Sequence, residues 1–274
     1  MARFKDRNVI VTGASRGIGA SIAERMAAEG ANVVISARTV DRHDHLRGSL
    51  NETLDRCRAH GGRAEMIVAD LADADSRATI IPTALGLFDG RLDVLVNNAA
   101  AAIYASTLEY PLRRRRLMFE VNVQAPIDLA QAAIPGMVER GEGWIVNVSS
   151  GSAKHAAGPP FRTEGVATEI GVYGASKAAL NRITNAFAVQ LYGTGVRINT
   201  VEPRAAVMSE GAEVLVGNII RPDQIESMEA MVESVVVLCG CAPDLTGRIC
   251  VSLDLLQEVG ATVMTLDGQA PYLG

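Results

Sequence analysis

The chain has 274 residues, 48% of them hydrophobic, and a formal net charge of −5 at pH 7. This length and apolar content suit one large α/β domain with an ample core. The acidic balance and the aromatic content of 4% argue against the basic, stacking surface of a nucleic-acid-binding protein. No apolar run approaches the ~20 residues of a membrane span, and no signal peptide precedes the first strand. We therefore expect a cytoplasmic protein with no membrane partner.

Short apolar runs alternate with amphipathic patterns along the chain. The apolar runs predict strands over residues 8–12, 32–37, 64–69, 92–96, 143–149, 196–201 and 248–253. The amphipathic patterns predict helices over residues 18–29, 47–59, 74–86, 112–139, 174–192 and 223–240. Near-continuous apolar strands are typical of sheets covered on both faces. The sequence thus predicts a single α/β domain over residues 1–274, a doubly wound parallel sheet of about seven strands with helices on both faces.

The first predicted strand runs directly into a glycine-rich turn. The run Val9-Ile10-Val11 is followed by Thr-Gly-Ala-Ser-Arg-Gly-Ile-Gly over residues 12–19, and a helical pattern comes next. Strand, glycine turn and helix form the context that a dinucleotide fingerprint requires. The glycines let the backbone approach a pyrophosphate, and the N-terminus of the helix favours its negative charge. The spacing G-x-x-x-G-x-G differs from the common G-x-G-x-x-G.

Residues after the second strand indicate which nicotinamide cofactor is preferred. NAD-binding proteins of this type usually place an acid there to bind the ribose 2′-hydroxyl. Here the strand ends at Ala37, and Arg38 follows, while Arg16 lies inside the glycine turn. Two guanidinium groups can bracket a 2′-phosphate, so NADP(H) is preferred and NAD(H) stays possible because Asp41 is close by. The alternative is that both arginines are merely exposed.

Two groups of side chains resemble metal ligands. The first lies in the loop after the second strand and comprises Asp41, His43, Asp44 and His45. The second is the cysteines, Cys57, Cys239, Cys241 and Cys250. Neither group shows the paired spacing of a zinc site, so we expect a solvated loop, inert buried thiols and no metal. The arginine run 113–116 could bind an anion, but like-charge runs are usually a solvated helix face.

Two long connections leave predicted strands. Residues 151–172 contain Gly158-Pro159-Pro160, which indicates a loop in part. Residues 203–222 form the second connection. Long loops in compact domains are often active-site lids, so residues 151–172 are predicted to be a lid insertion and residues 203–222 a substrate loop. Both should lie over the same edge of the sheet.

A tyrosine and a lysine follow the first of these connections. Tyr173 and Lys177 stand four residues apart in Tyr-Gly-Ala-Ser-Lys, within a helical pattern. Residues i and i+4 share one helix face, so the cation is expected to lower the tyrosine pKa from its ordinary value near ~10. Such a tyrosine can exchange protons near neutral pH. The alternative is a surface tyrosine beside a solvated lysine.

These motifs together resemble the short-chain dehydrogenase/reductase family over residues 5–253. The matching features, in chain order, are the turn at residues 12–19, Asp70, Asn97-Asn98-Ala99, Asn122, Ser150 and Tyr173-x-x-x-Lys177. The chain also resembles the hydroxysteroid-dehydrogenase-like branch of the family, in residues 39–48, 202–207 and 245–248. The family has glycine where Ala100 and Arg204 stand, and a different ending after Asp254. Compared with the family, the connection over residues 151–172 also looks longer, by an insertion of about ten residues.

The resemblance implies a Rossmann fold and a catalytic tetrad. Tyr173 is the proposed acid/base, Lys177 lowers its pKa and holds the nicotinamide ribose, and Ser150 rather than Ser149 hydrogen-bonds the substrate oxygen. Asn122 orders a water beside the lysine, and Asp70 lies beside the adenine. The implied cofactor contacts are Gly13, Ser15, Arg16, Gly17, Ile18, Gly19, Arg38, Asp70, Leu71, Asn98, Ala99, Tyr173, Lys177 and Pro203. A homodimer or homotetramer is expected.

The function expected from these residues is oxidoreduction. An NADP(H)-dependent enzyme would transfer hydride between the nicotinamide and a hydrophobic ketone or secondary alcohol, such as a steroid, terpenoid or acyl compound. Apolar residues at Ala101–Ile103, Met208 and Val214–Val216 motivate that substrate class, although they could equally be core. The alternative is a non-catalytic nucleotide-binding or scaffold protein on the same fold.

Overall fold

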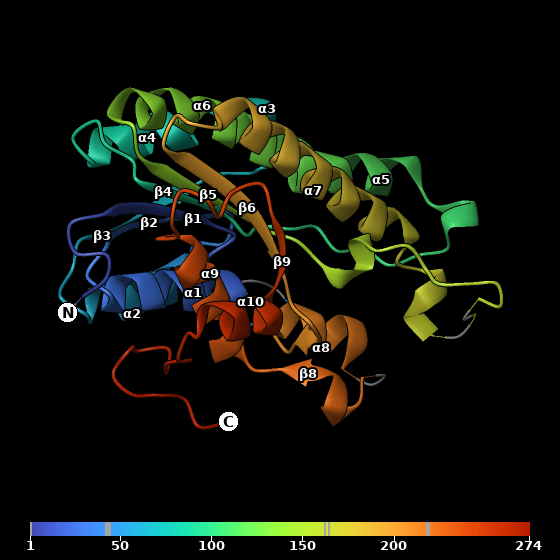
Figure 1. Ribbon diagram of the computed structural model, residues 1–274. Coiled ribbons are helices and arrows are strands. Elements are labelled where there is room, and N and C mark those ends of the chain that lie inside the picture. Colours follow the sequence, from blue (N-terminus) through green and yellow to red (C-terminus); the bar gives the residue numbers. More distant parts are fainter. Residues whose placement is uncertain (1, 42–44, 162, 164, 218–219) are drawn as a thin grey trace.

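The computed structural model describes residues 2–41, 45–161, 163, 165–217 and 220–274 (Figure 1). Its centre is a seven-stranded parallel sheet in the order β3-β2-β1-β4-β5-β6-β9. The strands are β1 Asn8–Thr12, β2 Asn32–Ala37, β3 Ala64–Val68, β4 Val94–Asn97, β5 Gly143–Val148, β6 Val196–Glu202 and β9 Ile249–Val251. The strand order reverses between β1 and β4, and ligands bind at such switch points, outside the carboxyl ends of the strands.

Both faces of the sheet are covered, as the uninterrupted apolar strands predicted. One face carries α1 Gly17–Ala28, α2 Leu50–Arg58, α9 Met228–Leu238 and α10 Ser252–Val259. The other face carries α3 Ala74–Ala78, α4 Ile80–Leu87, α5 Leu112–Phe119, α6 Ala125–Arg140 and α7 Gly171–Leu191 (Figure 1). Alternate strand residues enter the two apolar clusters, with Val9 and Val11 in one and Ile10 in the other. The fold is therefore the doubly wound α/β arrangement expected.

Side-chain caps determine where several helices begin or end. The helix expected from residue 47 begins at Leu50, because the Ser49 side chain accepts a hydrogen bond from the Glu52 N–H. The helix expected from residue 223 begins at Met228 after the Ser227 cap. The residues before it form η5 Pro222–Gln224 and β8 Ile225–Glu226, which pairs with β7 Ala206–Val207. The two-residue strands and α10 are elements that the periodicity of the sequence did not predict.

The long helix predicted over residues 112–139 is not continuous. Its residues form α5, a π-helical turn η2 Glu120–Gln124, and α6. The π turn inserts an extra residue into the helical ladder, a distortion that is frequent at functional sites. Asn122 lies inside this turn and is fully buried. The distortion therefore coincides with one of the candidate catalytic residues.

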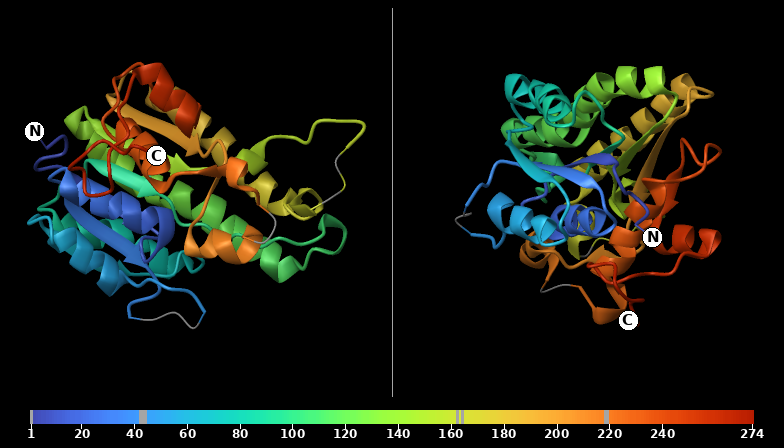
Figure 2. Two further views of the ribbon diagram at one scale, coloured as in Figure 1. Left: turned by 90° about the horizontal axis from the view of Figure 1, so that it is seen from below. Right: turned by 90° about the vertical axis from the view of Figure 1, so that its left-hand side faces the viewer.

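The two long connections leave the same edge of the sheet and differ in structure. Among its described residues, the first contains η3 Gly151–Ala153 and η4 Gly165–Thr168 before α7, and residues 154–161 project away from the body of the molecule (Figure 2). The second contains β7, α8 Glu210–Val216 and η5. A further short helix, η1 Thr107–Glu109, precedes α5.

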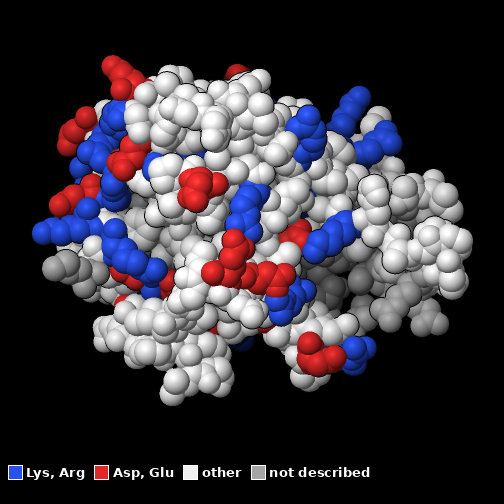
Figure 3. Space-filling view, viewed as in Figure 1, with Lys and Arg blue, Asp and Glu red and all other residues white. Residues whose placement is uncertain are grey.

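The remaining expectations from the sequence concern thiols, metal ligands and charge. All four cysteines are free and buried, as expected. His43 and Asp44 lie outside the described residues, and within the described ranges no three His, Cys, Asp or Glu side chains are grouped as metal ligands. Residues 113–116 are exposed, and on the face in Figure 3 basic and acidic side chains are interspersed. Among the described helices, none is both long and apolar enough to span a bilayer.

Candidate active site

The turn after β1 is shaped by glycines that no other residue could replace. Gly13 has φ +65°, and a Cβ there would stand 2.6 Å from the Cα of Ala99. A Cβ on Gly19 would stand 2.3 Å from Nδ2 of Asn98 and 2.5 Å from the carbonyl oxygen of Gly13. All three distances are far below van der Waals contact, so a side chain would displace the turn. The turn therefore packs against the end of β4 before any ligand is considered.

Asn98 and Thr12 lock these two strand ends together. The Asn98 amide donates to the carbonyl oxygens of Thr12 and Gly13 at 3.0 and 3.3 Å. The Thr12 hydroxyl oxygen accepts from the N–H groups of Asn98 and Ala99, each at 3.2 Å. The NH2 group of the Asn98 side chain is thus hydrogen-bonded within the protein. In this structure Asn98 supports the glycine turn.

The N-terminus of α1 fits an anionic group. Its cap residue is Arg16, whose backbone is extended, and among the described residues no side chain caps this helix end. Its first turn also carries no acidic residue. Uncapped N–H groups and the helix dipole together favour a phosphate at such a position. The pyrophosphate of a bound dinucleotide can therefore be placed at this helix end.

The two arginines expected at a 2′-phosphate lie near one another. The Nε atom of Arg16 donates to the carbonyl oxygen of Arg47 at 2.9 Å, and Arg38 forms an ion pair with Asp70 at 3.6 Å. Burial lowers the pKa of Arg16, the carboxylate of Glu210 raises it, and the charge of Arg38 lowers it. The Arg38 side chain is 68% exposed, so a ligand can approach its guanidinium. The structure brings Arg16, Arg38 and Asp70 to one corner of the sheet edge.

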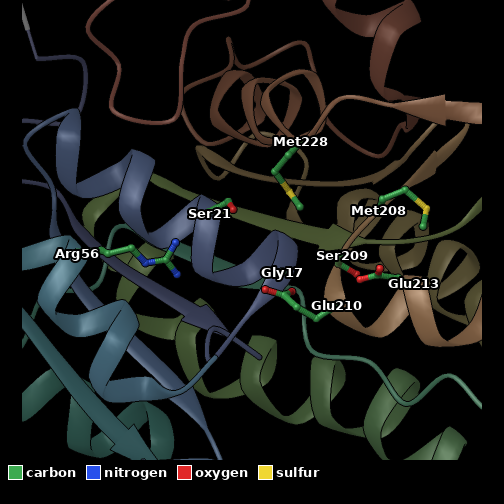
Figure 4. Close-up of a pocket in the computed structure, with 8 residues that line it drawn as sticks. All are labelled: Gly17, Ser21, Arg56, Met208, Ser209, Glu210, Glu213 and Met228. Atoms are coloured by element: carbon green, nitrogen blue, oxygen red, sulfur yellow. The ribbon is translucent and has the colours of Figure 1, made fainter. Parts of the chain in front are cut away.

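The substrate loop reaches the same helix end. The Cβ atom of Ser209 would stand 2.9 Å from a Cβ on Gly17, and Oε2 of Glu210 would stand 3.5 Å from it. Ser209 caps α8 by accepting from the Ala212 N–H at 3.3 Å. Figure 4 shows these residues beside Gly17, around a hollow of about 230 Å³ that Met208 and Met228 also line. The loop therefore borders the candidate cofactor site directly.

Tyr173 and Lys177 lie one turn apart near the start of α7. The Nζ atom of Lys177 lies 5.9 Å from the centroid of the Tyr173 ring and donates to the carbonyl oxygen of Val148 at 2.8 Å. Lys177 is only 2% exposed, and Tyr173 is half-buried. The expected shared face is thus present, and β5 holds the ammonium in place.

The expected direction of the Tyr173 pKa shift is wrong for this structure. Burial raises the pKa of Tyr173, the neighbouring Tyr104 adds to the rise, and a hydrogen bond with Ser150 offsets part of it. Burial also lowers the pKa of Lys177, from 10.5 to about 8. Desolvation, the largest cause, therefore decides the direction of the Tyr173 shift. In this structure Tyr173 is held as a protonated donor at neutral pH.

Ser150 and Ser149 have different surroundings, as strand alternation predicted. The Ser150 hydroxyl oxygen accepts from the backbone N–H of Ser152 at 3.2 Å and from its hydroxyl at 2.9 Å. A serine oxygen has two acceptor positions and one proton, so Ser150 keeps its own proton for Tyr173 or a substrate oxygen. Ser149 is buried, and its hydroxyl has no partner among the described residues. Ser150 is therefore the serine that can act at the site.

Asn122 is occupied by contacts within the protein. Its side chain accepts from the Ala101 N–H at 2.8 Å, and donates to the Ala101 carbonyl oxygen at 2.9 Å and the Ser176 hydroxyl at 3.0 Å. These bonds tie the π turn to the loop after β4 and to α7. The role of Asn122 in ordering a water stays a prediction.

Arg204 and Pro203 follow β6 at the same sheet edge. Arg204 is not among the described non-glycine residues with positive φ, which are Asp6 and Asp89, so replacing the family's glycine strains nothing here. The backbone N–H of Arg204 donates to the buried Glu226 at 2.8 Å, and its guanidinium pairs with Asp254 of α10. The sequence departs from the family pattern after β6 and again after residue 254. The Arg204–Asp254 ion pair joins these two regions.

Sequence reasoning missed three side chains at this edge. Tyr104 packs against Tyr173, with ring centroids 5.7 Å apart. Ser152 orients Ser150, and Lys154 forms an ion pair with the buried Glu202 at 2.7 Å. No motif marks these residues, because each contact joins segments that are distant in sequence or lies in a connection of irregular structure. The exception is the Ser-x-Ser spacing at residues 150–152, which a capping pattern could have suggested.

Comparison with known proteins identifies the family. The short chain dehydrogenase family matches residues 7–215. This is more than half of the chain, so the protein belongs to the short-chain dehydrogenase/reductase family, as its motifs suggested. A short chain dehydrogenase of Mycobacterium thermoresistibile superposes with a TM-score of 0.80 and 29% identity, covering 97% of this chain and 92% of that one. A short chain dehydrogenase of Burkholderia cenocepacia J2315, solved with NADP, gives 0.76 and 28%, covering 91% and 97%.

Curated relatives include proteins named for the branch that the sequence resembles and also a ketoacyl reductase. Hydroxysteroid dehydrogenase-like protein 2 of Bos taurus is 29% identical over 252 residues, covering 92% of this chain and 58% of the relative. Ketoacyl reductase HetN of Nostoc sp. is 35% identical over 203 residues, covering 74% of this chain and 64% of the relative. The chain thus spans less than two thirds of each of these two relatives.

Proposed function

We propose that the protein is an NADP(H)-dependent oxidoreductase that acts on a hydrophobic ketone or secondary alcohol, such as a steroid, terpenoid or acyl compound. The observation that carries the proposal is the placement of Tyr173 beside Ser150 and one helical turn from the buried Lys177. Membership of an oxidoreductase family supports it. The proposal treats residues 1–274 as one domain that works as a cytoplasmic homodimer or homotetramer.

In the direction of reduction, the residues of the chain handle the proton. Tyr173 donates its hydroxyl proton to the carbonyl oxygen, while the Ser150 hydroxyl donates a hydrogen bond to the same oxygen as negative charge develops there. Lys177 stabilises the phenolate that Tyr173 becomes. When bound, NADPH supplies the hydride that reduces the carbonyl carbon. In alcohol oxidation the same groups act in reverse, with Tyr173 accepting the proton.

The residues around the α1 N-terminus are those that would hold the cofactor. The uncapped helix end supports a pyrophosphate contact by Gly13, Ser15 and residues 17–19. The remaining proposed contacts are Asp70 and Leu71 for the adenine side, and Asn98, Ala99, Tyr173, Lys177 and Pro203 for the nicotinamide side. NADP-bound relatives of the same fold support a nicotinamide dinucleotide.

The preference for NADP(H) rests on Arg16 and Arg38. Both carry positive charge at the corner where a 2′-phosphate would lie, and no acid ends β2. We expect NADPH to bind more tightly than NADH, and the Arg38→Asp variant to lose that preference because a carboxylate repels the phosphate. Titration of both cofactors measures the two dissociation constants. Equal affinities in the wild-type protein would rule out the preference, as would an Arg38→Asp variant that retains it.

A substrate screen followed by one substitution tests the catalytic assignment. A panel of steroid, terpenoid and acyl ketones is assayed through the absorbance of NADPH, and the best substrate is then assayed with Tyr173→Phe. General acid catalysis contributes about 10²–10⁴-fold, so kcat should fall by at least about 10²-fold while the dissociation constant of NADPH is unchanged. The matched control is Tyr192→Phe, since Tyr192 is 81% exposed.

The same experiment separates the two functional candidates. A Tyr173→Phe enzyme that keeps most of its kcat would show that the proton moves through another group. A protein that binds NADPH but reduces no member of the panel would instead support the non-catalytic nucleotide-binding alternative. The steady-state rates and the cofactor titration together distinguish these outcomes.

A further inference from the structure

The loop after β4 is fixed at three alternate residues. The backbone of Ala101 is bonded on both sides by the Asn122 side chain. The carbonyl oxygen of Ile103 accepts from the Tyr110 hydroxyl at 2.8 Å, and the N–H of Ala105 donates to the carbonyl oxygen of Glu169 at 3.1 Å. The three anchors come from the π turn, the chain before α5 and the end of the lid. A loop held in this way presents its remaining side chains in defined positions.

Tyr104 lies between two of these anchors and faces the catalytic residue. The side chains at 101, 103 and 105 pack against the small apolar cluster of Tyr110, Met118 and Val172. The Tyr104 ring packs against the Tyr173 ring, with centroids 5.7 Å apart and planes tilted by 54°. This is the separation and tilt of a favourable aromatic pair. Tyr104 is therefore a direct neighbour of the proposed acid/base.

The Tyr104 hydroxyl has no hydrogen-bond partner among the residues that the structure describes. The side chain is half-buried, and burial raises the pKa of its phenol, so the hydroxyl stays protonated at neutral pH. The nearby Tyr110 hydroxyl, in contrast, is bonded to the loop backbone. Partly buried tyrosine hydroxyls normally find a partner. A positioned donor that the protein leaves unused is suited to a ligand.

We propose that Tyr104 is a specificity-determining residue whose hydroxyl donates a hydrogen bond to a second oxygen of the substrate. The inference rests on the proposed function, because it places the reacting carbonyl or alcohol at Tyr173 and Ser150. Since the two tyrosine rings are in contact, the second oxygen must lie within a few bonds of the reacting carbon. The substrate class is therefore narrowed to ketones and alcohols that carry an oxygen on the α or β carbon.

Matched ketones test the proposal. Ethyl acetoacetate and 2-heptanone have the same chain length, but only the first has a second carbonyl oxygen on the β carbon. Cyclohexanone and 2-hydroxycyclohexanone form the α-oxygenated pair. A neutral hydrogen bond contributes about 0.5–1.5 kcal/mol, so the oxygenated member of at least one pair should have a kcat/KM about twofold to tenfold higher. In Tyr104→Phe this preference should disappear through a loss on the oxygenated ketone alone.

Two controls and a binding measurement complete the design. Tyr192→Phe should keep the preference, because that hydroxyl is on the exposed surface. Tyr110→Phe removes an anchor of the loop and should lower the rates of both ketones in a pair together. The dissociation constants of each pair are also measured with the NADPH complex of Tyr173→Phe and of Tyr173→Phe/Tyr104→Phe. There the second substitution should weaken binding of the oxygenated ketone only.

The outcomes separate this inference from the function on which it rests. If wild-type protein reduces ketones without preference in either pair, or if Tyr104→Phe keeps the preference, Tyr104 does not select the substrate and the catalytic assignment stands. If neither pair nor any ketone of the panel is reduced while NADPH binds, the proposed function fails, and this inference fails with it.

Discussion

The turn after β1 and the segment after β5 leave the same edge of one sheet, but they are held in different ways. From Gly13 to Gly19 every residue is buried or half-buried. In the second segment, residues 154–161 are all exposed. The first is packed at Gly13 and Gly19 against the residues that follow β4, Asn98 and Ala99. The second is attached near its two ends, by the Lys154–Glu202 ion pair and by the Ala105–Glu169 hydrogen bond.

We relate this difference to the two kinds of ligand that the proposed function requires. A dinucleotide presents the same pyrophosphate in every relative that binds it, so a rigid turn against a helix end is sufficient. A substrate varies in size and polarity, and a segment attached near its two ends can vary in sequence without disturbing the sheet. Tyr173 and Lys177 lie between the two regions. Both are on α7, and neither region alone determines the position of this helix.

The largest expected effect comes from adding one methyl group to the rigid turn. Gly19→Ala would place a Cβ 2.3 Å from the Asn98 side chain and 2.5 Å from the Gly13 carbonyl oxygen. Overpacking of this kind costs about 1–3 kcal/mol or more, and a displaced turn no longer presents its N–H groups to a pyrophosphate. We expect the dissociation constant of NADPH to rise by about 10²-fold, measured by titration.

The control for this prediction is Gly86→Ala in α4. A Cβ there meets no atom of the described chain within 4 Å, and alanine is preferred to glycine within a helix by roughly 0.5–1 kcal/mol. This variant should bind NADPH as the wild type does and unfold at an equal or higher urea concentration. If Gly19→Ala also binds NADPH normally, the close packing of the turn is unimportant for the cofactor.

The second prediction concerns Lys177, at the boundary between the regions. Burial lowers the pKa of Lys177 from 10.5 to about 8, so the unfolded chain binds this proton more tightly than the folded one. At pH 7 the charged lysine thus destabilises the fold by about 3 kcal/mol, partly offset by its bond to Val148. Lys177→Met should therefore raise the free energy of unfolding by about 1–3 kcal/mol at pH 7, although activity is lost.

The pH dependence identifies the cause of this effect. The cost of the buried charge is complete below pH 8 and disappears as pH rises from 8 to 10.5, where the unfolded lysine also loses its proton. The stability advantage of Lys177→Met should therefore be smaller at pH 9.5 than at pH 7. Urea unfolding of the cofactor-free proteins at both pH values measures it. A variant that is less stable than the wild type at both would show that the hydrogen bond to Val148 outweighs the desolvation.

The contrast between the regions also explains what the sequence could predict. The sheet and the glycine turn depend on local patterns: β-branched runs such as Val9–Val11, and glycines whose need for close packing shows in their spacing. The pKa shift of Tyr173 was predicted in the wrong direction because the motif shows the lysine but not the burial of the phenol. The rise comes from burial and from the charge interaction with Tyr104, a residue distant in sequence, and no local pattern reveals either cause.

Elements with few residues were missed for a related reason. The pair β7 and β8 has two residues per strand, too few for any periodicity, and it is fixed by the buried Glu226, which accepts from Arg204 and Ser252. At Asn122 the sequence predicts ordinary helix, because the apolar pattern continues through the π turn. These elements are consequences of tertiary hydrogen bonds and are visible only once the fold is known.

Shortening the exposed segment is the third prediction, and it tests whether the loosely held region acts only on substrate. Replacing residues 156–167 by two glycines keeps both of its attachments, Lys154–Glu202 and Ala105–Glu169. Because lids orient the substrate and exclude water, KM for the best ketone should rise by roughly tenfold. The dissociation constant of NADPH should not change. If steady-state kinetics are unaltered for every active ketone, residues 151–172 are a surface loop and not a lid.

The smallest expected effect comes from the point where the substrate loop touches the rigid turn. Oε2 of Glu210 lies 3.5 Å from where a Cβ of Gly17 would stand, and its carboxylate raises the pKa of Arg16. This negative charge stands near the N-terminus of α1, where the pyrophosphate is proposed to bind. A charge near a helix terminus contributes about 0.3–1 kcal/mol, so Glu210→Gln should tighten NADPH binding about twofold to fivefold. The gain should shrink at high salt because the interaction is screened.

The matched control for Glu210 is Glu213→Gln, on the next turn of α8, where the side chain is exposed. That variant removes the same formal charge from the same helix and should leave the affinity for NADPH unchanged. Equal tightening by both variants would mean that the net charge of the loop acts at long range, with no specific contact at Gly17. Unchanged or weaker binding by Glu210→Gln would mean that the carboxylate does not compete with the pyrophosphate. The two regions would then be independent even where they touch.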